Sequence, residues 1–171
     1  MTRRYRSTHD LISFCERLLK PNPRANAEKV LEEVVDELYR GRDYRAIGIY
    51  LAVDHKFICQ SWRGLDKPVQ SFPLGVEQSI SADSNTSDLA QSVKIGARIL
   101  GMIYVRNASS QEHPFLDQVA KLLARYLTTD QGKLLFRKAR KNSPNVEAEP
   151  HKRPQSARPK LTLAAAAERA R

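Results

Sequence analysis

The sequence is poor in cysteine and aromatic residues, and it has no long apolar run. Its two cysteines, Cys15 and Cys59, stand far apart, without the spacing of a metal site or a redox motif. No apolar run reaches the roughly 18 residues of a membrane-spanning helix. Charged residues at Asp10, Glu16 and Arg17 interrupt the first apolar stretch, so we expect no secretory signal. We therefore predict a protein of the reducing cytoplasm with two buried thiols.

The residue patterns of common catalytic and metal sites are also missing. The seven glycines are dispersed and form neither a P-loop nor a dinucleotide-binding fingerprint. The histidines are scattered, without a pair at the spacing of metal ligands: His9, His55, His113 and His151. The pair Asp54-His55 is interpreted as a solvated turn, with a metal contact as the less favoured alternative. We predict no catalytic residue, no metal site and no cofactor.

Positive charge is concentrated near the C-terminus. The net charge is +10, and the residues from Lys133 onward contribute +8 of it, with 11 Lys or Arg and 3 Glu. We predict a basic and mostly disordered tail over residues 131–171, in which Lys133–Lys141 is able to form a short helix. Such a tail either keeps the protein soluble or holds RNA, DNA or an acidic protein in a weak, salt-dependent manner. No aromatic residue lies in 142–171 to stack on bases, which argues against sequence-specific recognition of a nucleic acid.

Two helices are predicted before the first strand. Ser7 is a helix cap, and an apolar stripe follows it within residues 1–21: Leu11, Cys15, Leu18 and Leu19. This stripe packs either within the monomer or against its copy in a dimer. A second helix is predicted to begin at Asn22-Pro23 and to end at Gly41.

After Gly41 the spacing of apolar residues changes from that of a helix to the two-residue alternation of strands. The predicted strands are Ala46–Val53, Phe57–Trp62, a weak Val69–Leu74, Ser87–Val93 and Arg98–Arg106. The first is apolar on both faces, which is typical of a central strand. The last places Ile99, Ile103 and Val105 on one face and Leu100, Met102 and Tyr104 on the other. Val76–Thr86 has no periodicity, and Pro114 opens a final helix. The fold class is therefore α/β (α+β), with a central antiparallel sheet of about five strands.

This order of elements resembles the GAF domain. Ser87–Val105 is similar to that family's closing hairpin, with a Ser-Asp-Leu-Ala start, a glycine turn and an Ile-Leu-Gly strand. Phe72-Pro73-Leu74-Gly75 is similar to its third strand, and Phe115–Tyr126 is similar to its final helix. The resemblance covers about Ala25 to Leu127, so we place a GAF-like domain at residues 22–130. A PAS-like sheet is the alternative fold.

The resemblance implies a sheet with helices from both chain ends on one face and a ligand pocket on the other. GAF domains serve as sensory or dimerisation modules in bacterial signalling, and they often bind cyclic nucleotides, tetrapyrroles, haem or small metabolites. The family inserts a longer roofing segment where this chain has only Val76–Thr86. We therefore expect an open sheet face that a partner or a second copy covers, carrying these residues: Tyr50, Trp62, Met102 and Tyr104.

Three functions follow, in order of preference. The first is a cytoplasmic, non-catalytic regulatory module that acts by protein contact, as a homodimer or with a signalling partner. The second is a small-molecule sensor that binds its ligand on the predicted sheet face, although the same aromatic residues are also interpreted as core. The third is an enzyme like the free methionine-(R)-sulfoxide reductases of the GAF family. It is disfavoured, because that chemistry needs neighbouring thiols and no cysteine follows Cys59.

Overall fold

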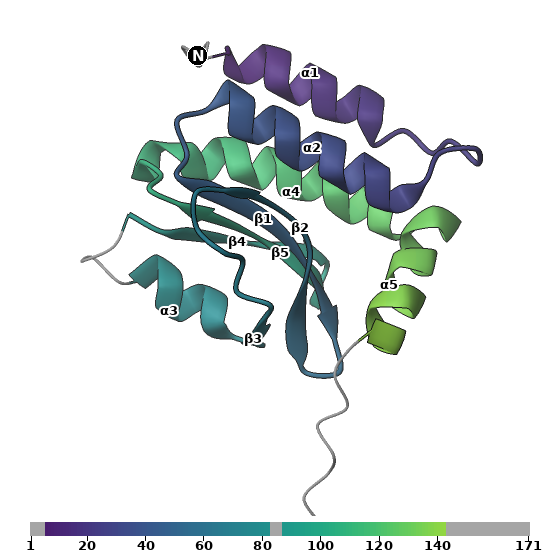
Figure 1. The fold of residues 1–171 in the computed structure, drawn as a ribbon. Helices are drawn as coiled ribbons and strands as arrows, with labels where there is room; N and C mark the ends of the chain where they lie inside the picture. The colour runs from purple at the N-terminus through teal and green to yellow at the C-terminus, as the bar shows by residue number, and fades with distance from the viewer. Residues whose placement is uncertain (1–5, 83–86, 143–171) are drawn as a thin grey trace, which may run out of the picture.

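The computed structural model describes residues 6–82 and 87–142. It contains a five-stranded sheet of the order β3-β2-β1-β5-β4, in which all neighbouring strands are antiparallel (Figure 1). The strands are β1 (Ala46–Val53), β2 (Lys56–Gly64), β3 (Ser71–Pro73), β4 (Leu89–Ile95) and β5 (Arg98–Arg106). The helices are α1 (Thr8–Leu18), α2 (Ala27–Gly41), α3 (Val76–Ala82), α4 (His113–Leu127) and α5 (Asp130–Asn142), with a 3-10 turn at Ser110–Glu112. The predicted α+β class and antiparallel sheet are confirmed.

The first two helices begin at side-chain caps. The hydroxyl of Ser7 accepts a hydrogen bond from the Asp10 backbone N–H at 3.1 Å, as the sequence predicts. The second helix begins later than predicted, because Asn26 rather than Asn22 caps it and accepts from the Glu28 N–H at 2.9 Å. Asn22 instead forms a tight turn, in which its carbonyl accepts from the Ala25 N–H at 2.9 Å.

One face of the sheet carries the main hydrophobic core. Helices α2 and α4 lie against this face, and α1 packs on both of them (Figure 1). The side chains of Leu11 and Cys15 on α1 are 0% exposed. The apolar stripe of the first helix is therefore buried within the monomer, which decides between the two alternatives that the sequence left open.

The packed fold extends to Asn142 rather than ending at residue 130. Helix α5 contacts α2, α4 and β1, and it buries Leu135 and Ala139. The predicted basic helix over Lys133–Lys141 is thus confirmed, but it belongs to the domain and not to a tail. Its register explains this, because Leu135 and Ala139 are one helical turn apart and face the core together. The disorder predicted further along the chain falls on residues 143–171, outside the described residues.

Two residues at the start of β5 lie on the faces opposite to those predicted. Ile99 packs on the side of α3, and Leu100 packs in the main core. The cause is a β-bulge: Val93 pairs with Gly101 while Lys94 pairs with Ile99, so Leu100 is an extra residue in β5. An extra residue reverses the alternation of faces. The faces predicted by strict two-residue alternation are therefore wrong for Ile99 and Leu100.

Candidate functional site

The second face of the sheet is covered by α3 (Figure 1). The prediction of an unstructured connection over Val76–Thr86 is wrong for its first part, which forms the helix Val76–Ala82. Val76 and Ile80 are one turn apart, and both pack against the cluster of side chains on this face. Glu77 stands in the first turn, where a carboxylate stabilises the helix. The face therefore has a short roof of its own.

The four predicted site residues come together on this face, but the face is not open. Tyr50 and Met102 are fully buried and Tyr104 is 6% exposed, while Trp62 is half-buried. The expectation of an exposed sheet face is thus wrong. Phe72 on β3 completes the group, and sequence reasoning missed it because β3 is short and weakly patterned. Ligand binding by these residues stays a prediction.

Four of these side chains form an aromatic cluster, which we define as Tyr50, Trp62, Phe72 and Tyr104. The rings of Tyr50 and Phe72 are 5.3 Å apart, and those of Phe72 and Tyr104 are also 5.3 Å apart. Trp62 stacks on Tyr104 at 6.2 Å. These separations lie in the range of favourable ring contacts. Gly48 makes the arrangement possible, because a Cβ at this position would press on the rings of Trp62 and Tyr50.

The polar atoms of the aromatic cluster are bound by the chain itself. The Tyr50 hydroxyl donates a hydrogen bond to the Val69 carbonyl at 3.0 Å. The Trp62 Nε1–H donates to the Asp66 carbonyl at 2.8 Å. The Tyr104 hydroxyl donates to Asp88 Oδ2 at 2.6 Å. A ligand in this place would have to compete with these bonds.

The two tyrosines of the cluster remain neutral donors. Burial raises the pKa of Tyr50 well above its usual range. Burial also raises the pKa of Tyr104, and the hydrogen bond to the Asp88 carboxylate raises it further. Neither phenol is therefore poised to lose a proton near neutral pH, and acid–base catalysis by these groups is not supported.

A charged network lies at the end of the aromatic cluster. Arg45 Nε donates to Asp66 at 2.9 Å, and Arg106 donates to Asp66 at 3.0 Å and lies 3.5 Å from Asp88. The hydrogen bond from Arg45 lowers the pKa of Asp66. A hollow of about 390 Å³ opens beside the network and is lined by Arg45, Ser87, Asp88, Arg106 and Asn107. Two guanidinium groups face two carboxylates here, so the network has little excess charge with which to attract an ion.

The two cysteines lie on opposite sides of the sheet. Cys15 is buried in the main core, whereas Cys59 on β2 is half-buried and packs on the side of the aromatic cluster. Both thiols are free. Burial raises the pKa of the Cys15 thiol to about 12 and that of the Cys59 thiol to about 11. These thiols cannot form a disulfide with each other across the sheet, and neither is an activated nucleophile.

Alkylation should show how unreactive the thiols are. The pKa of Cys59 rises from 9.0 to about 11, so its thiolate fraction at pH 8 should fall about 100-fold, and its rate with iodoacetamide should fall in proportion. Mass spectrometry of the native chain measures this rate, and the same chain in urea, where both thiols react freely, is the control. Rapid alkylation of Cys59 in the native chain would contradict the geometry described above.

The described residues contain no group of three or more His, Cys, Asp or Glu side chains that could hold a metal ion. Within the same part of the chain, no helix is both long and apolar enough to cross a membrane.

Comparison with known proteins identifies the fold. No protein-family profile and no curated protein matches the sequence. Among solved structures, the nlh2 GAF domain of A. aeolicus in an inactive state superimposes with a TM-score of 0.56 at 17% identity, over 70% of this chain and 94% of that one. The GAF domain of a phosphoenolpyruvate-protein phosphotransferase from Coxiella burnetii gives 0.60 at 13% identity, over 75% and 96%.

An enzyme shares the same fold. Free methionine-R-sulfoxide reductase from Neisseria meningitidis, in complex with its substrate, superimposes with a TM-score of 0.59 at 11% identity, over 73% of this chain and 94% of that one. At such identities the likeness concerns the fold and not the activity. The chain therefore has a GAF-like fold, with helices on one face of an antiparallel sheet.

Proposed function

We propose that this chain is a non-catalytic regulatory module of the bacterial cytoplasm, which acts by contact with another protein or with a second copy. The observation that carries the proposal is the closed second face of the sheet. Tyr50 and Met102 are fully buried there, and the hydroxyl and indole donors of the cluster are bound within the chain. A small molecule gains affinity by filling a preformed, water-accessible hollow, and these side chains already occupy that space.

The cysteines support a non-catalytic role. Reduction of a sulfoxide by cysteine begins with attack by a thiolate and ends with a disulfide to a second thiol. Cys15 and Cys59 are the only cysteines of the chain, and the sheet separates them. The raised pKa of each thiol further disfavours the thiolate at neutral pH. The reductase function is therefore the weakest of the three candidates.

One observation favours the small-molecule sensor as the second candidate. Glu77 on α3 is 7% exposed, and its Oε2 atom has no hydrogen-bond partner within the described structure. A buried carboxylate oxygen normally has a donor, and an orphaned one is consistent with a polar ligand beneath α3. Such a ligand would require α3 to move away from the aromatic cluster.

Native mass spectrometry of the full chain tests the proposal. We expect masses that correspond to the chain alone, as a monomer or a dimer, without a retained small molecule. A retained mass that disappears in Trp62→Ala or Tyr104→Ala, but persists in the surface variant Leu65→Ala, would overturn the proposal in favour of the sensor. Leu65 is a suitable control because it is 80% exposed and lies outside the cluster.

A further inference from the structure

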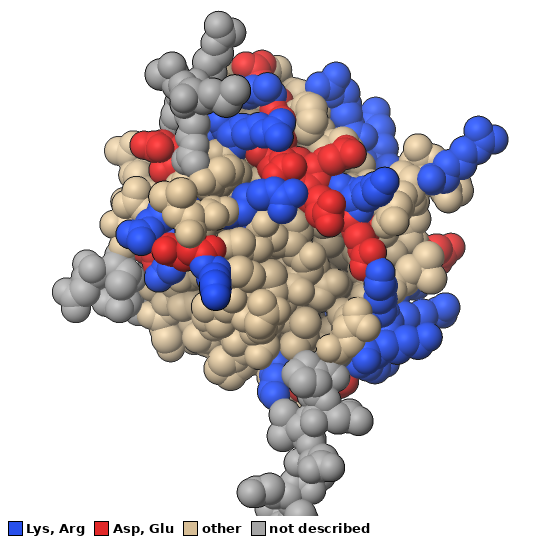
Figure 2. All heavy atoms as spheres, viewed as in Figure 1, with Lys and Arg blue, Asp and Glu red and all other residues tan. Residues whose placement is uncertain are grey.

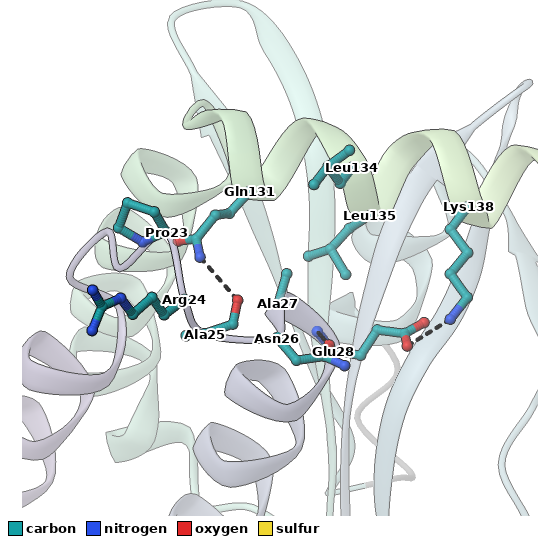
Figure 3. Close-up of a pocket in the computed structure, with 10 residues that line it drawn as sticks. All are labelled: Pro23, Arg24, Ala25, Asn26, Ala27, Glu28, Gln131, Leu134, Leu135 and Lys138. Atoms are coloured by element: carbon teal, nitrogen blue, oxygen red, sulfur yellow. Dashed lines mark hydrogen bonds and ion pairs between the residues drawn. The ribbon is translucent and has the colours of Figure 1, made fainter.

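A groove lies on the helical side of the molecule, between the start of α2 and α5 (Figure 3). Its volume is about 410 Å³, and its wall is formed by residues 23–28 together with Gln131, Leu134, Leu135 and Lys138. Half of these ten residues are apolar, with Pro23 and two alanines on one side and two leucines on the other (Figure 3). The groove lies far in sequence from the aromatic cluster and belongs to none of the features described above.

Hydrogen bonds and an ion pair hold both walls of the groove in place. The side chain of Gln131 donates to the Ala25 carbonyl at 3.0 Å and accepts from the Asn22 N–H at 3.1 Å. At the other end, Lys138 pairs with Glu28 at 2.6 Å (Figure 3). The groove therefore exists before anything binds, which reduces the entropy lost on binding.

An exposed leucine of α5 lines the edge of this groove. Leu134 is 57% exposed, whereas its neighbour Leu135 is 2% exposed and belongs to the main core. A second hollow of about 400 Å³ shares Pro23 and Gln131 with the groove. An apolar surface with an exposed leucine at its edge fits the apolar side of a helix.

Helix α5, which forms one wall of the groove, is positively charged. Helix α5 carries five Lys or Arg residues and one Asp, and Figure 2 shows basic side chains gathered over α5 at the lower right. Within the described part of the chain, Arg137 and Lys141 are exposed and make no ion pair. Arg24 adds a further cation at the wall formed by the α1–α2 connection. The acid that lines the groove, Glu28, is already neutralised by Lys138.

We infer that this groove, which we call the α2–α5 groove, binds an acidic amphipathic helix of a partner protein. The partner's apolar side covers Leu134, and its carboxylates face the cations of α5. This inference rests on the proposed function, because it names the partner of a module that acts by protein contact.

Charge and apolar character together favour this occupant over two others. Residues 143–171 of the chain carry 6 Lys or Arg and 3 Glu, so they have the same sign as α5. A nucleic acid would contact the cations but would leave Leu134 in water.

A designed peptide tests the inference on the full chain. The probe is a helical peptide of about four turns, with leucine at every third or fourth position and glutamate at most others. Fluorescence anisotropy of the labelled peptide measures its affinity for the chain. We expect Leu134→Gln to weaken binding about tenfold or more, because the buried leucine contact is lost. The matched variant Leu65→Gln, at another exposed leucine, should bind as the unmodified chain does.

Charge reversal tests whether the cations of α5 contact the carboxylates of the partner helix. Arg137→Glu combined with Lys141→Glu should weaken binding of the same peptide by about tenfold or more, and the affinity of the unmodified chain should fall with added salt. Lys94→Glu is the control, since Lys94 is exposed on β4, whereas Arg137 and Lys141 lie on α5, which forms a wall of the groove. Thermal unfolding of each variant should match that of the unmodified chain, because all these side chains are exposed.

Three outcomes would overturn the inference. The peptide does not bind, or a peptide with glutamine in place of every leucine binds equally well, or a DNA duplex binds more tightly and is unaffected by Leu134→Gln. The last result would assign α5 to nucleic acid instead. A small molecule retained in native mass spectrometry would overturn the proposed function without changing these affinities, so the two failures are distinguishable.

Discussion

The variant Tyr50→Ala is expected to lose about 3–5 kcal/mol of unfolding free energy, as large-to-small changes of aromatic residues in closed cores do. Tyr50 is 0% exposed, and its ring contacts those of Phe72 and Tyr104. Removing the ring leaves a cavity that the strands cannot close, because Tyr50 lies in the central strand β1 between β2 and β5. Urea unfolding followed by circular dichroism measures the loss.

Two control variants distinguish the effect of losing the ring from the effects of losing the hydroxyl and of a surface substitution. Tyr50→Phe removes only the hydrogen bond to the Val69 carbonyl, and it should lose about 1 kcal/mol. Leu65→Ala, at an 80% exposed position, should change stability by less than about 0.5 kcal/mol. If Tyr50→Ala were as mild as Leu65→Ala, the aromatic cluster would be the lining of a loosely filled pocket. That result would favour the small-molecule sensor over the module that acts by protein contact.

The second large effect is expected at Arg42, whose guanidinium is buried. Its Nε lies 3.2 Å from Glu112, and its other nitrogens donate to the Arg6 carbonyl and the Thr8 hydroxyl, each at 2.6 Å. The guanidinium also stacks 4.5 Å from the Phe115 ring. Arg42→Met should therefore lower the free energy of unfolding by about 3–5 kcal/mol, since it leaves the half-buried Glu112 carboxylate without its cation.

A double-mutant cycle identifies the source of that loss. The Arg42→Met and Glu112→Gln double variant should be less destabilised than the sum of the single variants, because it no longer buries an unpaired charge. Arg40→Met is the control, since Arg40 is exposed in the last turn of α2. Equal stability of Arg40→Met and Arg42→Met in urea would show that the buried pair contributes little.

The burial of Tyr50 can be predicted from the sequence, whereas that of Arg42 cannot. Tyr50 lies in a strand that is apolar on both faces, and this pattern predicts both its strand and its central place. Arg42 and Glu112 are ordinary charged residues in the sequence, and our sequence analysis singled out neither. They become one buried group only when the start of α1, the end of α2 and the start of α4 meet.

The sequence by itself determined the elements whose signal is local. Side-chain alternation predicted β1 and β5 with the bounds that the structure has, and the Ser7 cap and the apolar stripe predicted α1. Alternation also places Met102 and Tyr104 on one face of β5. This information lies within a few consecutive residues, and no distant partner is needed to read it.

Only the tertiary structure decided what covers each face. The segment Val76–Ala82 has no periodicity in the sequence and forms a helix because Val76 and Ile80 pack against the side chains of the second face. The sequence of α5 has the composition of a charged tail, and the helix joins the domain because Leu135 and Ala139 pack in the main core. The faces of Ile99 and Leu100 depend on a bulge that pairing with β4 creates. In each case the stabilising contact joins residues far apart in the chain, so the burial that fixes the conformation exists only after the sheet has formed.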